Sequence, residues 1–169
     1  MIQKTLVLIK PDAVKRNLIG EIISRYEKVG LEVVELKKLI APTDIVEKHY
    51  PGDESYLRSI GEKSVQAGDD QVTDTLSQGR KVVGWLRNFI TSGPIVCMIL
   101  AGEEAVSLTR KITGYTDPAT AEKGTIRGDL GEDSILVANR DGRSVYNLIH
   151  ASGTEEEAAK EIKLWFGKL

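Results

Sequence analysis

The sequence predicts an α/β (α+β) protein with a ferredoxin-like βαββαβ sandwich, in which helices pack on one antiparallel sheet and further helices and loops are inserted. Two observations predict this fold. Strand-like and helix-like segments alternate so that two β-α-β units surround one sheet. The 169 residues contain no internal repeat and no interdomain linker, so we expect a single domain.

Residues 1–50 predict a strand, a helix, a second strand and a short helix. Thr5–Lys10 is apolar and bounded by proline, which indicates a buried strand. Apolar residues at helical spacing predict a helix over 19–29, which a glycine ends. The run 31–40 predicts the second strand. An Asp44–Glu47 capping box then predicts a helix that ends by Tyr50, because proline follows.

The middle of the chain begins with a polar stretch. Residues 51–79 are rich in glycine, aspartate, serine and glutamine, so we expect an excursion with only a helical turn or two. Apolar positions from Val82 to Ile90 predict an amphipathic helix, which Ser92-Gly93-Pro94 ends. A strand over 95–101 and a helix over 103–113 follow.

The last third combines a long loop with a final strand and helix. Residues 114–143 are rich in glycine, aspartate and threonine and predict a loop. A short strand is expected at Val145–Ile149. Thr154 and Glu157 form a capping box that opens the final helix, whose apolar stripe reaches Phe166.

The composition excludes several classes of protein. The formal net charge is −2, so no broad cationic surface is expected that would bind nucleic acid or an anionic membrane. Cys97 is the only cysteine and lies in a predicted strand, where an inert core thiol is expected. No apolar run approaches the ~20 residues of a membrane span, and no signal peptide is recognisable, so we expect a cytoplasmic protein.

The two histidines have different settings. His49 ends a predicted helix, where a cation is favoured and a structural role suffices. His150 closes a predicted strand just before a helix, so its ring is expected beside free backbone N–H groups that favour an anion. A neutral imidazole there could accept a phosphoryl group and release it again. Glu161, two turns into the helix, could reach back to orient the ring, or be an ordinary solvated charge.

Three cations are candidates for holding the phosphates that such chemistry requires. Lys10 ends the first strand, Arg110 lies on the predicted helix before a glycine, and Arg127 lies between glycines. Phosphoryl transfer depends on positioning and on neutralising the transferring oxygens. A surface ion pair is the alternative for each residue. The sequence contains no Walker A, GxGxxG, CxxC or HExxH pattern, which argues against P-loop, Rossmann and caged zinc sites.

Six segments, in this order along the chain, resemble the nucleoside diphosphate kinase family. They are Ile9-Lys10-Pro11-Asp12-Ala13-Val14, Ser92-Gly93-Pro94, Gly114-Tyr115-Thr116-Asp117-Pro118-Ala119, Gly124-Thr125-Ile126-Arg127-Gly128-Asp129, Asn147-Leu148-Ile149-His150-Ala151-Ser152 and Glu161-Ile162-Lys163-Leu164-Trp165-Phe166. The resemblance covers residues 1–169 as one domain of this type, except for 51–79 and about 131–143, which look like insertions relative to the common short form.

The resemblance implies an activity and a site. The chain would transfer the γ-phosphate of a nucleoside triphosphate to a nucleoside diphosphate, by a ping-pong mechanism through a phosphohistidine at His150, with Ser152 and Glu161 orienting the ring. The implied nucleotide-binding residues are Lys10, Tyr50, Arg110, Thr116, Arg127 and Asn147. Mg²⁺ would be held through the nucleotide phosphates, with no protein ligand. The substrates would be ATP/ADP, GTP/GDP and others, and the protein a homo-oligomer, either a tetramer or a hexamer.

Two departures from the family pattern affect this interpretation. Val82 is the nearest counterpart of the phenylalanine on which the family stacks the base, with Tyr56 and Trp85 as alternatives. An apolar contact reads no base edge, so we expect broad nucleotide use. Gly153 stands where the family commonly has aspartate, which removes a charge near the site.

Two other functions remain as alternatives. The first is a nucleotide-binding or regulatory protein that has lost catalysis, although binding alone does not require a histidine nucleophile. The second is a nucleic-acid-binding module on the same fold, which the negative charge and the 5% aromatic content disfavour.

Overall fold

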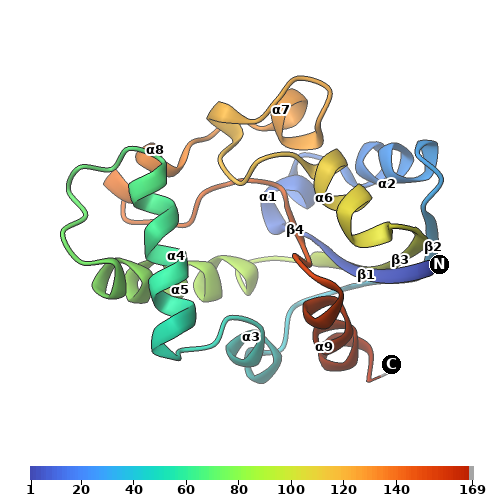
Figure 1. Ribbon diagram of the computed structural model, residues 1–169, viewed down its shortest axis with the longest axis horizontal. Helices are drawn as coiled ribbons and strands as arrows, with labels where there is room; N and C mark the ends of the chain where they lie inside the picture. Colours follow the sequence, from blue (N-terminus) through green and yellow to red (C-terminus); the bar gives the residue numbers. More distant parts are fainter. Residues whose placement is uncertain (168–169) are drawn as a thin grey trace.

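The computed structural model describes residues 1–167 and contains a four-stranded antiparallel sheet with strand order β2-β3-β1-β4 (Figure 1). The strands are β1 (Ile2–Ile9), β2 (Glu32–Leu39), β3 (Ile95–Glu103) and β4 (Ile149–Ala151). The predicted ferredoxin-like fold is confirmed. The first three predicted strands also match the structure to within a few residues.

Helices cover both faces of the sheet because side chains alternate along each strand. Val7 and Ile9 of β1 pack into a core with the helices α1 (Pro11–Lys15), α2 (Ile19–Lys28) and α6 (Ala105–Thr113). Leu6 and Leu8 pack into a second core on the opposite face, with α3 (Thr43–His49) and α9 (Glu155–Phe166). Figure 1 shows α2 and α6 on one side of the sheet and α3 and α9 on the other.

The last strand does not lie where the sequence predicted it. We expected Val145–Ile149, whereas β4 is Ile149–Ala151. The reason is Leu148, whose φ of 71° is left-handed and breaks the extended backbone. Its N–H donates to Asp12 Oδ2 over 3.0 Å, and its carbonyl accepts from Lys10 N over 2.8 Å. The short strand therefore centres on His150, which pairs with Leu8 and points to the face that carries α3 and α9.

The predicted excursion at 51–79 is wrong. It holds α4 (Glu54–Gln66) and the first turns of α5 (Thr75–Ile90), each capped by an aspartate, Asp53 or Asp74. The two helices cross closely at Gly61 and Gly79. A Cβ atom at Gly61 would lie 1.9 Å from the carbonyl oxygen of Thr75. At the crossing itself a glycine of each helix lies against backbone, and few apolar residues of this stretch, among them Leu57 and Ile60, join the core, so the apolar periodicity of the sequence is weak.

The predicted loop at 114–143 is also wrong. It contains the 3₁₀ helix η1 (Pro118–Thr120), α7 (Ile126–Leu130) and α8 (Ile135–Arg140). Side chains of Asp117, Thr125 and Ser134 cap these short helices. Their brevity leaves no room for an apolar stripe, so local composition suggested a loop.

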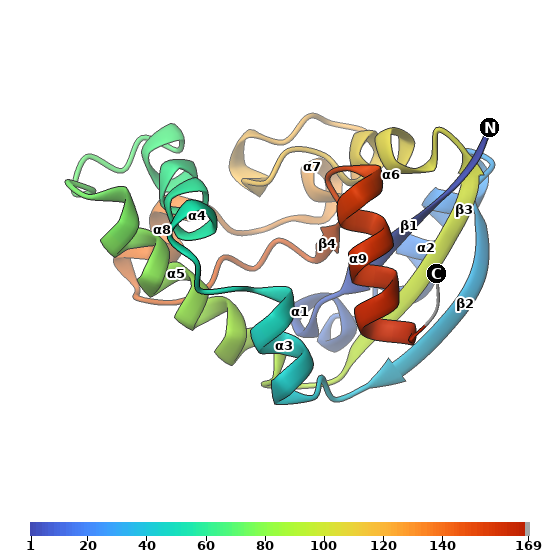
Figure 2. The same ribbon diagram turned by 60° about the horizontal axis from the view of Figure 1, so that its bottom comes forward.

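The two predicted insertions form one unit, which we call the insertion lobe: α4, the beginning of α5, and α8. Asn139 Nδ2 on α8 donates to Ser64 Oγ over 3.0 Å and to Asp69 Oδ2 over 2.8 Å. Gln78 of α5 also donates to Ser64 Oγ, over 3.3 Å. Figure 2 shows α4, α5 and α8 together at one end of the molecule.

The remaining outcomes concern two helix caps, the cysteine and the lengths of the helices. The Asp44–Glu47 capping box is wrong, because α3 begins at Thr43 after Pro42 and has no side-chain cap. The Thr154 cap is confirmed, since its Oγ1 accepts from Glu157 N over 3.1 Å. Cys97 is buried, as expected. Across residues 1–167, no helix has the length and apolarity that crossing a membrane requires.

Candidate functional site

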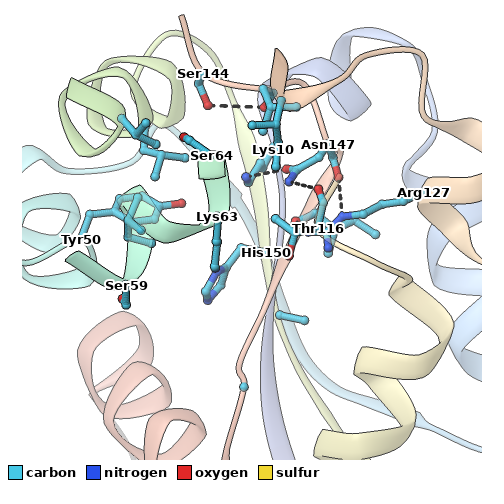
Figure 3. Close-up of a pocket in the computed structure, with 18 of the residues that line it drawn as sticks. Lys10, Tyr50, Ser59, Lys63, Ser64, Thr116, Arg127, Ser144, Asn147 and His150 are labelled. Carbon is cyan, nitrogen blue, oxygen red and sulfur yellow. Dashed lines mark hydrogen bonds between the residues drawn. The ribbon is translucent and has the colours of Figure 1, made fainter. Parts of the chain in front are cut away.

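A cavity of about 410 Å³ lies between the insertion lobe and the edge of the sheet at which β1 ends and β4 begins (Figure 3). Its walls come from segments far apart in the sequence. Eight of the ten predicted site residues line it: Lys10, Tyr50, Val82, Arg110, Thr116, Arg127, Asn147 and His150. The other two, Ser152 and Glu161, are buried behind His150. The structure thus brings all ten predicted residues together.

His150 is the only histidine side chain on the cavity wall among the described residues, and 19% of that side chain is exposed. Burial lowers its pKa well below the ordinary value of 6.5, and Lys10 lowers it further, while Glu157 opposes the shift. A charged imidazolium is therefore disfavoured, and the ring is neutral at pH 7.

A chain of hydrogen bonds holds the imidazole from behind. Glu161 Oε1 lies 2.8 Å from His150 Nε2, and Ser152 Oγ donates to Glu161 Oε2 over 2.6 Å. A carboxylate can only accept a hydrogen bond, so the proton of the neutral His150 ring lies on Nε2. The lone pair of Nδ1 is then free. The sequence argument that Glu161 reaches back to orient the ring agrees with this geometry.

His49 belongs to the same cluster, and the sequence argument missed this role. Its buried ring stands edge-on to His150, with centroids 4.4 Å apart and planes at 81°. Trp165 Nε1–H donates to His49 Nδ1 over 3.2 Å, so the proton of the neutral ring lies on Nε2. Burial, and after it His150, lowers the pKa of His49 to about 3. The ring is therefore not the cation that a helix end favours, whereas the structural role that the sequence suggested agrees with its buried hydrogen bond to Trp165.

Lys10 follows β1 directly and lies beside Leu148, whose carbonyl accepts the Lys10 backbone N–H. Its Nζ donates to Asn147 Oδ1 over 2.8 Å, and Asn147 Nδ2 donates to the Thr116 carbonyl over 2.9 Å. Burial, and after it Arg127, lowers the pKa of Lys10 to about 7, although Asp12 partly opposes the shift. This ammonium group is poorly compensated, so an anion in the cavity would stabilise its charged form.

The two arginines differ in how firmly they are held. Arg127 is buried and donates to the carbonyl oxygens of Asn147, Gly114 and Ile149. These bonds use three of its five N–H donors and leave two. Arg110 is exposed at the cavity, and its only hydrogen bond within residues 1–167 is a long one of 3.4 Å to the Ala151 carbonyl.

The opposite end of the cavity is largely apolar. Val82 lines it together with Ile60, Leu86, Ile135 and Val145. Tyr56, proposed as an alternative to Val82, also lines the cavity, whereas Trp85 does not. Tyr50 stands between the two ends, and Figure 3 shows its side chain reaching into the cavity. Burial raises the pKa of Tyr50 far above 10, so its hydroxyl stays protonated.

Gly153, which stands where the resemblance implies an aspartate, has the carboxylate of Glu157 beside it. Glu157 Oε2 accepts from Gly153 N over 2.7 Å, and both residues line the cavity. A Cβ atom at Gly153 would lie only 2.8 Å from that oxygen. The carboxylate therefore takes space that a side chain at 153 would occupy. The sequence argument had placed Glu157 only in a helix cap.

Metal-ligating side chains cluster at one place in the described part of the chain. Nitrogens of His49 and His150 and an oxygen of Glu161 lie within 4.8 Å of one another. Two of these atoms already make the hydrogen bonds described above. Mg²⁺ prefers oxygen ligands, and Glu157 is the only acidic residue among those that line the cavity. Among the described residues, the cavity thus offers a Mg²⁺ ion a single carboxylate, that of Glu157.

Comparison with known proteins places this site in a family. The family model "Nucleoside diphosphate kinase" matches residues 3–57 and 53–169. A nucleoside diphosphate kinase of Pyrobaculum aerophilum is 46% identical over 98% of this chain and 95% of its own length. One of Borreliella burgdorferi is 37% identical over 98% of this chain and 88% of its own length.

Solved structures agree with the sequence comparison. A crystal structure of a Pyrobaculum aerophilum NDP kinase aligns with a TM-score of 0.91 and 42% identity, over 98% of this chain and 96% of that chain. A Borrelia burgdorferi nucleoside-diphosphate kinase, a transition state mimic with bound vanadate and ADP, aligns with a TM-score of 0.78 and 37% identity, over 98% and 87% of the two chains. This chain therefore belongs to the nucleoside diphosphate kinase family, whose members are phosphotransferases that act on nucleotides.

Proposed function

We propose that this enzyme moves the γ-phosphate of a nucleoside triphosphate to a nucleoside diphosphate through a phosphohistidine at His150. One observation carries the proposal. The His150 ring faces a cavity lined by Lys10, Arg110 and Arg127, while a buried carboxylate holds its Nε2 from behind. A nucleophile with a free lone pair and fixed cations for the transferring oxygens are the two requirements of such a transfer.

The transfer has two half-reactions in this geometry. His150 Nδ1 attacks the γ-phosphorus, an N–P bond forms, and the bond from that phosphorus to the β-bridging oxygen breaks, which releases the diphosphate. A terminal oxygen of a second nucleoside diphosphate then attacks the phosphorus and breaks the N–P bond. The Nε2 proton stays on the ring in both steps, and Glu161 stabilises the positive charge that develops there.

The nucleotide would lie along the cavity with its base at the apolar end. Val82 would contact the base, and Asn147 would bind the ribose side together with Lys10, which would also hold phosphates. Tyr50, Arg110, Thr116 and Arg127 would hold phosphates. The ADP and vanadate in the Borrelia burgdorferi enzyme support a nucleotide and a phosphoryl group in the corresponding cavity. An apolar base contact supports use of ATP, GTP and other nucleotides alike.

Mg²⁺ would accompany the nucleotide, bound through its phosphates, and would supply further neutralisation of the transferring oxygens. The described cavity lining has one carboxylate, that of Glu157, and several cations, so the negative charge that would hold Mg²⁺ must come mainly from the nucleotide. We also propose a homo-oligomer, a tetramer or a hexamer. A cytoplasmic location stays a prediction.

The test incubates the protein with Mg²⁺ and γ-labelled ATP in the absence of an acceptor. We expect an acid-labile, alkali-stable phosphoprotein that ADP, GDP and other diphosphates discharge, and no label on His150→Ala. Chelation of the metal should reduce labelling strongly. Stable labelling of the Ala variant would show that another residue is the nucleophile. Nucleotide binding without any label on the wild-type protein would instead favour a binding protein that has lost catalysis.

A further inference from the structure

The insertion lobe places one basic side chain in the catalytic cavity that neither the sequence motifs nor the proposed mechanism uses. The pocket-lining residues of α4 are Tyr56, Ser59, Ile60, Lys63 and Ser64. Their spacing of three and four residues puts them on one face of the helix. Lys63 is the only basic residue among them. Figure 3 shows it on the lobe side of the cavity, near His150, with Arg127 and Thr116 across from it.

Lys63 is exposed on the cavity side of α4, and its ammonium group has no partner within the described residues. In the described part of the chain it makes no hydrogen bond and no ion pair. Arg58 on the same helix contrasts with it, because its guanidinium is paired with Glu54 over 2.7 Å. The charges that act on Lys63 are those of the phosphate end of the cavity: Arg110, Arg127 and Glu157. Partial burial lowers the pKa of Lys63, and the two arginines lower it further.

The helix that carries Lys63 is held in place by backbone packing. Gly61 lies against the carbonyl of Thr75 and Gly79 against that of Leu57, with no room for a Cβ atom at either position. Ser64, the next residue after Lys63, accepts hydrogen bonds from Gln78 and Asn139. The ammonium group is therefore presented to the cavity from a fixed wall, although its own side chain stays free to rotate.

We propose that Lys63 is a phosphate-binding residue: its ammonium group binds the β- and γ-phosphate oxygens of the nucleotide from the side opposite Arg127. This gives the 51–79 insertion a role in catalysis, since it supplies a cation that faces the transferring phosphoryl group. The inference rests on the proposed use of the cavity for nucleotides. An unpaired cation beside Lys10, Arg110 and Arg127 is destabilised by like charges, and a polyphosphate anion relieves that repulsion.

The test compares Lys63→Gln with Lys63→Arg and with the matched control Lys81→Gln, which removes an exposed lysine of α5 outside this cavity. Affinities for ADP and AMP are measured by calorimetry, and kcat/KM for ATP by steady-state kinetics. We expect Lys63→Gln to lose about tenfold to a hundredfold in ADP affinity and in kcat/KM, as for one charge-assisted hydrogen bond. AMP affinity should change less than about threefold on the same scale, and Lys63→Arg should recover much of the loss.

Each outcome bears on the proposal. Equal behaviour of Lys63→Gln and Lys81→Gln would overturn it, and so would an equal loss of ADP and AMP affinity, which would place Lys63 beside the ribose or base. Thermal unfolding should show that none of the three variants is less stable than the wild type, because Lys63 and Lys81 are exposed and Lys63 makes no hydrogen bond or ion pair in the described part of the chain. If the wild-type protein takes no label on His150, the proposed function fails, while the ADP and AMP affinities still test Lys63.

Discussion

The reactivity of His150 depends on two features of its surroundings. The register of β4 turns the ring away from the core formed by Ile149 and Ala151, toward α3 and α9. There Glu161 fixes the tautomer. Burial, and after it Lys10, disfavours a charged ring. The nucleophile is therefore oriented and neutral before any substrate arrives, which lowers the reorganisation that the reaction requires.

Replacing Glu161 by Gln should separate catalysis from stability. The amide keeps the shape of the side chain but removes the negative charge beside Nε2, so we expect kcat/KM for ATP to fall about tenfold to a hundredfold. The fold should not suffer, because burial raises the pKa of Glu161 above 4.5 and thus disfavours the charged side chain. Steady-state kinetics and thermal unfolding at pH 7.5 check both parts.

The pH dependence of stability gives an independent control. Between pH 4.5 and the raised pKa of Glu161, the folded protein keeps a proton that the unfolded chain has lost. Stability therefore falls as pH rises through that window, and Glu161→Gln should remove this slope. Glu156→Gln changes an exposed residue of the same helix and should leave kcat/KM unchanged. A Glu161→Gln variant with full activity would show that the carboxylate does not assist the histidine.

At the scale of elements, the crossing of α4 and α5 decides the shape of the cavity. The helices meet at Gly61 and Gly79, and the Ser64–Asn139 hydrogen bond joins α8 to them. Backbone and polar groups make these contacts, and few apolar residues of the two stretches join the core, which is why the sequence predicted an excursion and a loop where the structure has helices. Apolar periodicity predicts helices that pack through aliphatic side chains, and it fails for helices that pack backbone to backbone.

Two glycines of α5 should respond in opposite ways to the same substitution. Gly79→Ala places a Cβ atom 1.8 Å from the Leu57 carbonyl oxygen, so the helices must separate. We expect a loss of about 1–3 kcal/mol or more in the free energy of unfolding. Gly84→Ala has no atom within 4 Å of the new Cβ and should gain about 0.5–1 kcal/mol from helix propensity.

Chemical denaturation at one fixed protein concentration measures both changes, since association would otherwise shift the apparent stability. A neutral Gly79→Ala would mean that α4 and α5 do not pack as closely as described. The Gly84 variant serves as the control for the effect of an added methyl group in this helix.

At the scale of the whole molecule, β2 is the longer of the two edge strands of the sheet, the other being the three-residue β4. In the described part of the chain β2 pairs with β3 on one side only. Val34 and Leu36 on this strand and Ile40 just after it are 46%, 43% and 59% exposed. Half of the residues of β2 are charged, but an unpaired edge with these exposed apolar side chains can pair with a second copy, and this supports the proposed homo-oligomer.

Charge at this edge should weaken the assembly. Leu36→Lys is expected to lower the mass measured by light scattering, because a buried lysine without a partner disfavours the interface. Val65→Lys is the matched control, since Val65 is 49% exposed on the insertion lobe and outside the catalytic cavity. An unchanged mass for Leu36→Lys, or an equal effect of Val65→Lys, would show that β2 is not the interface.

The sequence by itself determined the sheet core, most of the long amphipathic helices, and the identity of the residues around the cavity. Strands such as 95–101 and the α9 stripe are local patterns that follow from side-chain alternation and helical spacing. The site residues were found by motif, because His150, Lys10 and Arg127 lie in short, distinctive segments. Their common cavity agrees with that prediction, while their roles await experiment.

The tertiary structure decided what local patterns do not encode. The left-handed Leu148 shifted the last strand toward His150, because its N–H finds its partner in Asp12, 136 residues away. His49 became part of the nucleophile's cluster because Trp165 and Glu161 meet it from α9. Lys63 entered the cavity because two glycines let its helix approach closely. Each of these contacts joins residues distant in the chain, so only the folded chain brings them together.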